Sequence, residues 1–209
     1  MSATPLQLPP VPNGESVRPI FLVPQKPRKL ARNFVPRHAG LEALEVLPSS
    51  EQQQFAELVG IRRRLRARAK GVVDQLVTEQ DPWRVETLGA LTELACAKAL
   101  GLEWLDPVFD MPACPDLGGA VEVRYTTRPD GCLLLQKTDP PQAPFVLVVV
   151  RNPICLLAGW VYGREGMRQD FWWEAGYDRP CYYVPQGYLR PMRSLLHLVR
   201  RGKAAELGL

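Results

Sequence analysis

Three charged residues that lie close together in the sequence could do chemistry: Asp116, Glu122 and Arg124. They belong to the stretch CPDLGGAVEVRYTT, in which a Gly-rich turn precedes alternating apolar and polar residues. The side chains of a strand point alternately to its two faces, so Glu122 and Arg124 must share a face. Two carboxylates and a cation at this spacing could bind a metal ion and a phosphate group. The same pattern is also typical of a half-buried strand whose polar face carries an ion pair.

A third acid, Glu93, lies in a predicted helix that Asp81-Pro82 begins and Gly101 ends. Small residues three and four positions away allow this helix to approach a sheet closely, so Glu93 is expected to point into the protein. These neighbours are Gly89, Ala90, Cys96 and Ala97. A buried carboxylate must be paired or bind a cation. Glu93 therefore either joins the candidate site or forms a structural ion pair with Arg124.

The turn sequence Arg128-Pro129-Asp130-Gly131 follows the alternating run, and the segment CLLLQKT after it predicts the returning strand of a β-hairpin. A loop of two or four residues places Lys137 opposite Glu122, whereas a three-residue loop places Gln136 there. Lys137 is thus a candidate second cation of the site.

The remaining periodic segments predict a sheet with helices packed on it. We expect an amphipathic helix from Ser49 or Ser50 to about Glu79 and a strand over 144–150 that is buried on both faces. Further predicted elements are a strand over 154–163, a helical segment over 167–174, a short strand over 181–184 and a helix over 191–201. The fold class is α/β or α+β, with a central mixed sheet flanked by helices.

Composition restricts the class of protein. The 209 residues are 46% hydrophobic with a net charge of +4, and the five cysteines show no paired spacing. We expect one domain over 49–209 with reduced thiols, and no apolar run is long enough to span a membrane. Without an apolar signal core, the expected location is cytoplasmic.

Basic residues gather in two segments. Residues 1–48 are proline-rich, and the six Lys/Arg between Glu15 and Glu42 have no acid among them. This predicts an extended arm that either lies on nucleic acid or a protein subunit, or is a solvated linker. The predicted helix that follows carries a second cluster, which is either a phosphate-binding or a solvated face. The second cluster consists of Arg62, Arg63, Arg64, Arg66, Arg68 and Lys70.

Together these features resemble the PD-(D/E)XK nuclease superfamily. Pro115-Asp116 with Glu122-Val123-Arg124 is similar to its signature, with arginine in the usual lysine place. Several blocks, over roughly 83–196, resemble small phage and prophage proteins assigned to that superfamily. The blocks are GALTELACAKALGL, VEVRYTT, PFVLVVV, LAGWVYGRE and YYVPQGYLRPM.

The resemblance implies a restriction-endonuclease-like core and Mg²⁺- or Mn²⁺-dependent hydrolysis of phosphodiesters, with DNA the expected substrate. It assigns the metal to Asp116 and Glu122, with Glu93 completing the site. Arg124 could steady the phosphate but cannot act as a base, and Lys137 could supply the missing amine. Two alternatives stay open: a nucleic-acid-binding protein without turnover, and a phage structural or assembly protein. A homo-oligomer is also compatible with the sequence, and the host cell's cytoplasm is the expected location of a phage protein.

Overall fold

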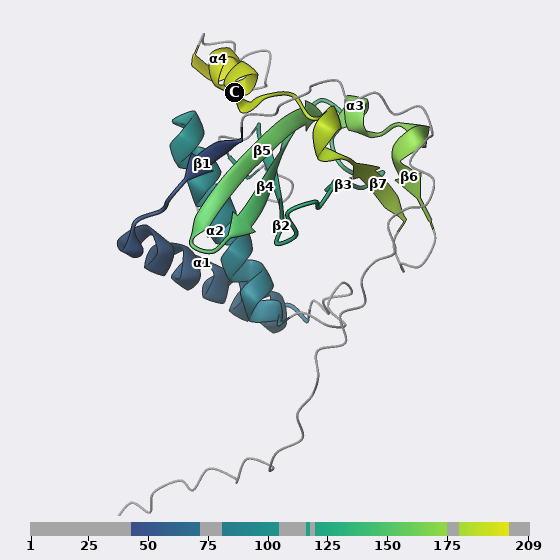
Figure 1. Cartoon of the computed structure of the whole chain (residues 1–209). Helices are drawn as coiled ribbons and strands as arrows, with labels where there is room; N and C mark the ends of the chain where they lie inside the picture. Colours follow the sequence, from purple (N-terminus) through teal and green to yellow (C-terminus); the bar gives the residue numbers. More distant parts are fainter. Residues whose placement is uncertain (1–42, 72–80, 105–115, 118–119, 175–179, 201–209) are drawn as a thin grey trace, which may run out of the picture.

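The structure, a computed structural model, describes residues 43–71, 81–104, 116–117, 120–174 and 180–200 (Figure 1). Within these ranges the chain forms two sheets and four α-helices, which is a mixed α/β fold as expected. The strands are β1 (Leu44–Val46), β2 (Glu122–Thr126), β3 (Leu133–Leu135), β4 (Pro144–Arg151), β5 (Ile154–Tyr162), β6 (Trp172–Trp173) and β7 (Cys181–Val184). The helices are α1 (Ser50–Ala69), α2 (Pro82–Leu100), α3 (Gly163–Gly166) and α4 (Met192–Arg200), with 3-10 turns at Gln169–Phe171 and Gln186–Tyr188.

The larger sheet has the order β1-β5-β4-β2. Strand β2 runs parallel to β4, whereas β4 and β1 run antiparallel to β5. The predicted central mixed sheet is therefore confirmed. The smaller sheet has the order β3-β7-β6 and is antiparallel.

Strand β4 is apolar and buried from Pro144 to Val150 because it is covered on both faces; its last residue, Arg151, is exposed. Val146 and Val148 belong to a core that includes residues of α2. Phe145, Leu147 and Val149 alternate with them and belong to a second core, shared with β3 and β7. Helix α2 thus packs on one face of the larger sheet and the smaller sheet packs on the other (Figure 1).

The two long helices begin where their local chemistry predicts. Ser49 caps α1 in a capping box: its hydroxyl oxygen accepts from the backbone N–H of Gln52, and its own backbone N–H donates to Oε1 of Gln52. Asp81 caps α2, which ends at Gly101 with a φ of 67°, a left-handed conformation that glycine adopts without strain. Helix α1 ends at Ala69, before the expected end near Glu79; residues 72–80 lie outside the described residues.

Helices α1 and α2 cross closely at Gly60. Ala56, Val59 and Gly60 are buried, and a Cβ added at Gly60 would lie 2.5 Å from the Cα of Thr87. Only glycine fits such an approach without moving a helix. The close crossing brings the second half of α1 against α2, which bears on the site described below.

Several expected elements differ from the structure. The predicted β-hairpin between β2 and β3 is wrong, because β2 pairs with β4 and β3 pairs with β7. In place of the predicted helical segment over 167–174, the structure has a 3-10 turn and β6, and the short helix α3 comes before them. The range expected as an arm contains β1, which pairs with β5, while residues 1–42 lie outside the described residues. In the described ranges, no helix combines the length and apolarity needed to cross a bilayer.

Candidate functional site

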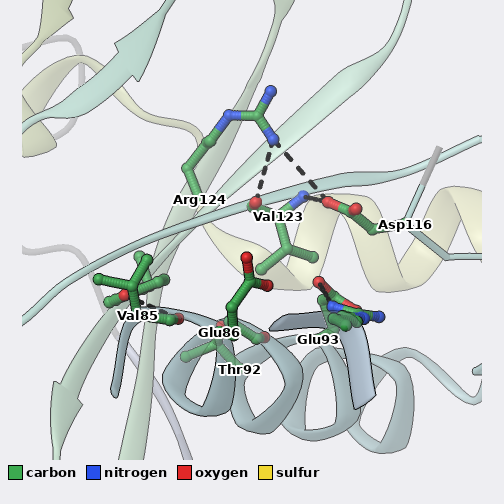
Figure 2. A pocket seen from close by; sticks show the side chains of 10 residues that line it. Val85, Glu86, Thr92, Glu93, Asp116, Val123 and Arg124 are labelled. Atoms are coloured by element: carbon green, nitrogen blue, oxygen red, sulfur yellow. Dashed lines mark hydrogen bonds and ion pairs between the residues drawn. The ribbon is translucent and has the colours of Figure 1, made fainter. Parts of the chain in front are cut away.

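An open cavity of about 290 Å³ lies between α2 and the edge strand β2 (Figure 2). Four elements contribute to it: α1, α2, the turn at Asp116, and β2. Its lining residues are Arg63, Val85, Glu86, Gly89, Thr92, Glu93, Asp116, Val123, Arg124 and Tyr125. Glu86, Gly89 and Glu93 recur at the spacing of one helix face, and a Cβ added at Gly89 would meet nothing within 4 Å. Gly89 therefore leaves room between the two acids.

Glu93 points into the protein, as predicted, and is only 7% exposed. Its partner is Arg63 of α1, whose two terminal nitrogens donate to the two carboxylate oxygens at 2.7 and 2.6 Å. The indole N–H of Trp104 donates to Oε2 at 3.0 Å. A bidentate arginine pair with a third donor satisfies a buried carboxylate. The ion pair proposed from the sequence, with Arg124 as the partner of Glu93, is therefore replaced by one with Arg63.

Asp116 lies in the turn before β2, and its Oδ2 accepts a hydrogen bond from the backbone N–H of Val123 at 2.8 Å. The same oxygen is 3.8 Å from Nη1 of Arg124. Burial raises the pKa of Asp116 to about 7, and the negative charge of Glu93 acts in the same direction. The Val123 N–H and the Arg124 charge oppose this rise only in part. Near neutral pH this carboxyl group can therefore both hold and release a proton.

Arg124 contributes to the lining of the cavity, and its guanidinium is held by contacts on the face of β2 that points away from α2. Nη1 donates to Oε2 of Glu122 at 3.0 Å and to the backbone oxygen of Val123 at 3.2 Å. Nη2 donates to Oδ1 of Asp139 at 3.3 Å, and the guanidinium carbon lies 5.3 Å from the centre of the Phe145 ring. The expectation that Glu122 and Arg124 share a face is confirmed. Glu122 is not among the residues that line the cavity.

Lys137 does not lie across from Glu122. The residue that pairs with Glu122 is Phe145 on β4, because β2 and β3 do not form the expected hairpin. The ammonium group of Lys137 lies 4.1 Å from the centre of the Trp172 ring, on the side of the smaller sheet. The register argument that made Lys137 the second cation of the site is therefore wrong.

The basic cluster of α1 does not act as one face. Arg63 turns towards α2, and its side chain is 18% exposed. Arg62 and Arg68 are exposed, whereas Arg64 and Arg66 are partly buried. Residues on consecutive helix positions point about 100° apart, so one surface cannot collect all six. Arg63 is a component of the candidate site, and phosphate contacts by the other five remain a prediction.

Sequence reasoning missed four contributors to the site: Arg63 as the partner of Glu93, the acids Glu86 and Asp139, and Tyr125. Glu86 had a usable signal, because it lies two helical turns before Glu93 on the same face. The hydroxyl of Tyr125 donates to the backbone oxygen of Val85 at 3.0 Å and so ties β2 to α2. Burial raises the pKa of Tyr125 to about 12, so this hydroxyl stays protonated as a donor at neutral pH. Asp139 had no local signal, since the fold alone brings it to Arg124.

No three His, Cys, Asp or Glu side chains within the described ranges gather into a set that could hold a metal ion. The carboxylates around the cavity are nevertheless the hard oxygen donors that Mg²⁺ and Mn²⁺ prefer. The hydrogen bond and the ion pair of Asp116 both involve Oδ2, which leaves Oδ1 for a ligand.

Comparison with known proteins gave no match: no family model, no curated protein and no solved structure is similar to this chain.

Proposed function

We propose that the cavity between α2 and β2 is the active site of a nuclease that hydrolyses phosphodiesters with the help of Mg²⁺ or Mn²⁺. One observation carries this proposal. Two carboxylates from different elements, Glu93 and Asp116, line the same open cavity as Arg124, whose Nη1 lies 3.8 Å from Oδ2 of Asp116. Carboxylates that can hold a metal ion and a positively charged side chain that can hold a phosphate oxygen are the components that such a reaction needs.

Asp116 is the residue best suited to hold the cation, through its Oδ1. Mg²⁺ is often held by only one or two carboxylates, with water and substrate phosphates completing the shell, so three protein ligands are not required. Glu93 is the second candidate, provided that it exchanges its contact with Arg63. When bound, the metal would lower the pKa of a coordinated water and offset the negative charge of the phosphate.

The protein side chains would have separate tasks. Arg124, fixed by Glu122 and Asp139, would hold a non-bridging phosphate oxygen at the mouth of the cavity. Asp116 has a pKa raised to about 7 by burial, so near neutral pH it would lose the proton that must leave before its carboxylate can hold the cation. Binding of Mg²⁺ or Mn²⁺ should therefore strengthen as pH rises through about 7.

The proposed substrate is DNA. The net charge of +4 and the basic residues of α1 and of the segment before β1 favour a polyanion over a small neutral substrate. Arginine and lysine contacts of this kind hold the phosphate backbone without reading bases. We therefore expect cleavage with little sequence preference.

A second function is a nucleic-acid-binding protein that has this fold but no turnover. Two observations favour it. The carboxylate of Glu93 already has hydrogen bonds from Arg63 and Trp104. The cation that β2 places beside Asp116 is Arg124, and a guanidinium cannot act as a base. In this case the protein binds DNA in a salt-dependent manner and leaves it intact.

Cleavage of plasmid and single-stranded DNA with Mg²⁺ or Mn²⁺ separates the two functions. We expect nicking by the wild-type protein and a loss of about 10²-fold or more in Asp116→Asn and Arg124→Ala. Lys137→Ala is the matched control, because its amine lies at Trp172 and its loss should leave the rate unchanged. Salt-dependent binding without cleavage by the wild-type protein would support the second function. A wild-type protein that neither binds nor cleaves DNA would refute both functions.

A further inference from the structure

Helix α1 exposes large apolar side chains on its outer surface. Among the described residues, five large hydrophobic side chains are exposed, and three of them lie on α1: Phe55 at 51%, Leu58 at 59% and Leu65 at 53%. Leu47, just before the helix, is 58% exposed. Single exposed apolar side chains are ordinary, but several along one helix indicate a surface that is covered by a partner.

The helix geometry gathers these side chains into a stripe. Leu58 and Leu65 are seven residues apart, which is two turns or about 10.5 Å along the axis, and so they face the same direction. Ala56, Val59 and Gly60 are buried on the opposite side, against α2. Within the described residues, Leu58 and Leu65 therefore lie outside the core of their own chain, whereas the Phe55 ring meets that of Trp104 edge-on, with 5.7 Å between the ring centres.

The charges beside the stripe change sign along the helix. Glu57 is exposed next to Leu58, and Arg68 is exposed near Leu65. At 100° per residue, Glu57 and Arg68 lie about 20° apart around the axis, on the same flank of the stripe. In a second α1 that runs antiparallel to the first, Arg68 therefore lies on the same flank and near the level of Glu57 of the first.

We propose that the α1 stripe is the contact surface for a second copy of this chain, with the two α1 helices antiparallel about a two-fold axis. In this arrangement Leu58 of one copy packs against Leu65 of the other, and Glu57 lies opposite Arg68. Both contacts occur twice, since a two-fold interface uses the same patch on both copies.

The charges beside the stripe favour a second copy over the chain's own N-terminal segment, because a second copy supplies an acid opposite Arg68. Residues 16–41 contain six Lys/Arg and no acid, so they carry the same sign of charge as the second half of α1. The antiparallel copy instead brings the acidic first half of one α1 to the basic second half of the other. A contact made by one helix is small, so we expect a dissociation constant on the order of 10 µM.

Sedimentation equilibrium of the full chain, from about 1 to about 200 µM, tests the proposal. We expect a reversible monomer–dimer equilibrium for the wild-type protein. Leu58→Asp and Leu65→Asp should each raise the dissociation constant at least about tenfold, because they place a charge in the apolar contact. Leu134→Asp is the matched control: Leu134 is 43% exposed on β3, outside the stripe, and its replacement should not change the constant. Circular dichroism confirms that each variant is folded.

Charge reversal tests the antiparallel register. Glu57→Arg and Arg68→Glu should each weaken the dimer, because each creates two like-charged contacts, and an equimolar mixture of the two variants should associate as the wild type does. Arg62, which flanks the stripe near the expected axis, would meet its own copy, so Arg62→Gln should tighten the dimer. A monomer at every concentration would overturn the proposal. So would a dimer that tolerates Leu58→Asp, or a mixture no tighter than the separate variants.

Discussion

Asp116 should destabilise the protein as its carboxyl group ionises, and replacing it with asparagine should remove this effect. Burial and the charge of Glu93 raise the pKa of Asp116 from an ordinary value of 3.8 to about 7. Between these pH values the folded protein keeps a proton that the unfolded chain has lost, so stability falls as pH rises through this window. One pKa unit corresponds to about 1.4 kcal/mol, and the whole shift therefore to at most about 4 kcal/mol.

The expected effect is smaller than this ceiling. The side chain of Asp116 is 28% exposed, and water screens part of the interaction. We expect the free energy of unfolding of Asp116→Asn to gain about 1–2 kcal/mol relative to wild type between pH 5 and pH 8. Asparagine can still accept the hydrogen bond from the Val123 N–H, so the turn before β2 should persist.

Urea unfolding of both proteins at several pH values between about 5 and 8 measures the difference. Asp130→Asn is a suitable control, because it makes the same isosteric change at a side chain that is 58% exposed in a surface turn. A difference that stays constant with pH, or grows towards low pH, would show that Asp116 ionises without penalty. The inference that burial and the charge of Glu93 disfavour the ionised form of Asp116 would then be wrong.

Two further predictions concern the contacts that shape the cavity, and urea unfolding at pH 7 measures both. Arg63→Ala leaves the buried Glu93 without its bidentate partner and should lower the free energy of unfolding by about 3–5 kcal/mol. Adding Glu93→Gln to this variant should recover part of the loss, and the absence of any recovery would argue against the ion pair. Gly60→Ala should cost about 1–3 kcal/mol, because the new methyl group meets the backbone of α2. Gly89→Ala, where nothing lies within 4 Å, should instead stabilise by up to about 1 kcal/mol, and equal effects at the two glycines would refute the close crossing.

The sequence was sufficient for those elements whose boundaries depend on nearby residues. The Ser49 capping box, the Asp81 start of α2 and its glycine stop all follow from contacts within a few positions. The inward orientation of Glu93 was also predictable, because helix periodicity fixes which neighbours share its face. The unbroken apolar run of β4 likewise predicted a strand covered on both faces.

Strand pairing was not predictable in the same way. The turn at Arg128–Gly131 does form, with the Gly131 N–H donating to the Arg128 oxygen at 3.0 Å, yet β3 pairs with β7 instead of returning along β2. A turn reverses the chain but does not choose the partner of the next strand. That choice depends on which apolar faces elsewhere need cover, and Leu133 and Leu135 are buried in the core beneath β4.

The site divides along the same line. The sequence alone determined that Asp116, Glu122 and Arg124 lie close together and that Glu93 is turned inward, because strand and helix periods act over a few residues. Only the tertiary structure decided that Glu93 pairs with Arg63, thirty positions away, and that Lys137 lies elsewhere. The physical reason is that a buried charge takes the nearest cation in space, and the crossing of α1 over α2 makes that cation Arg63.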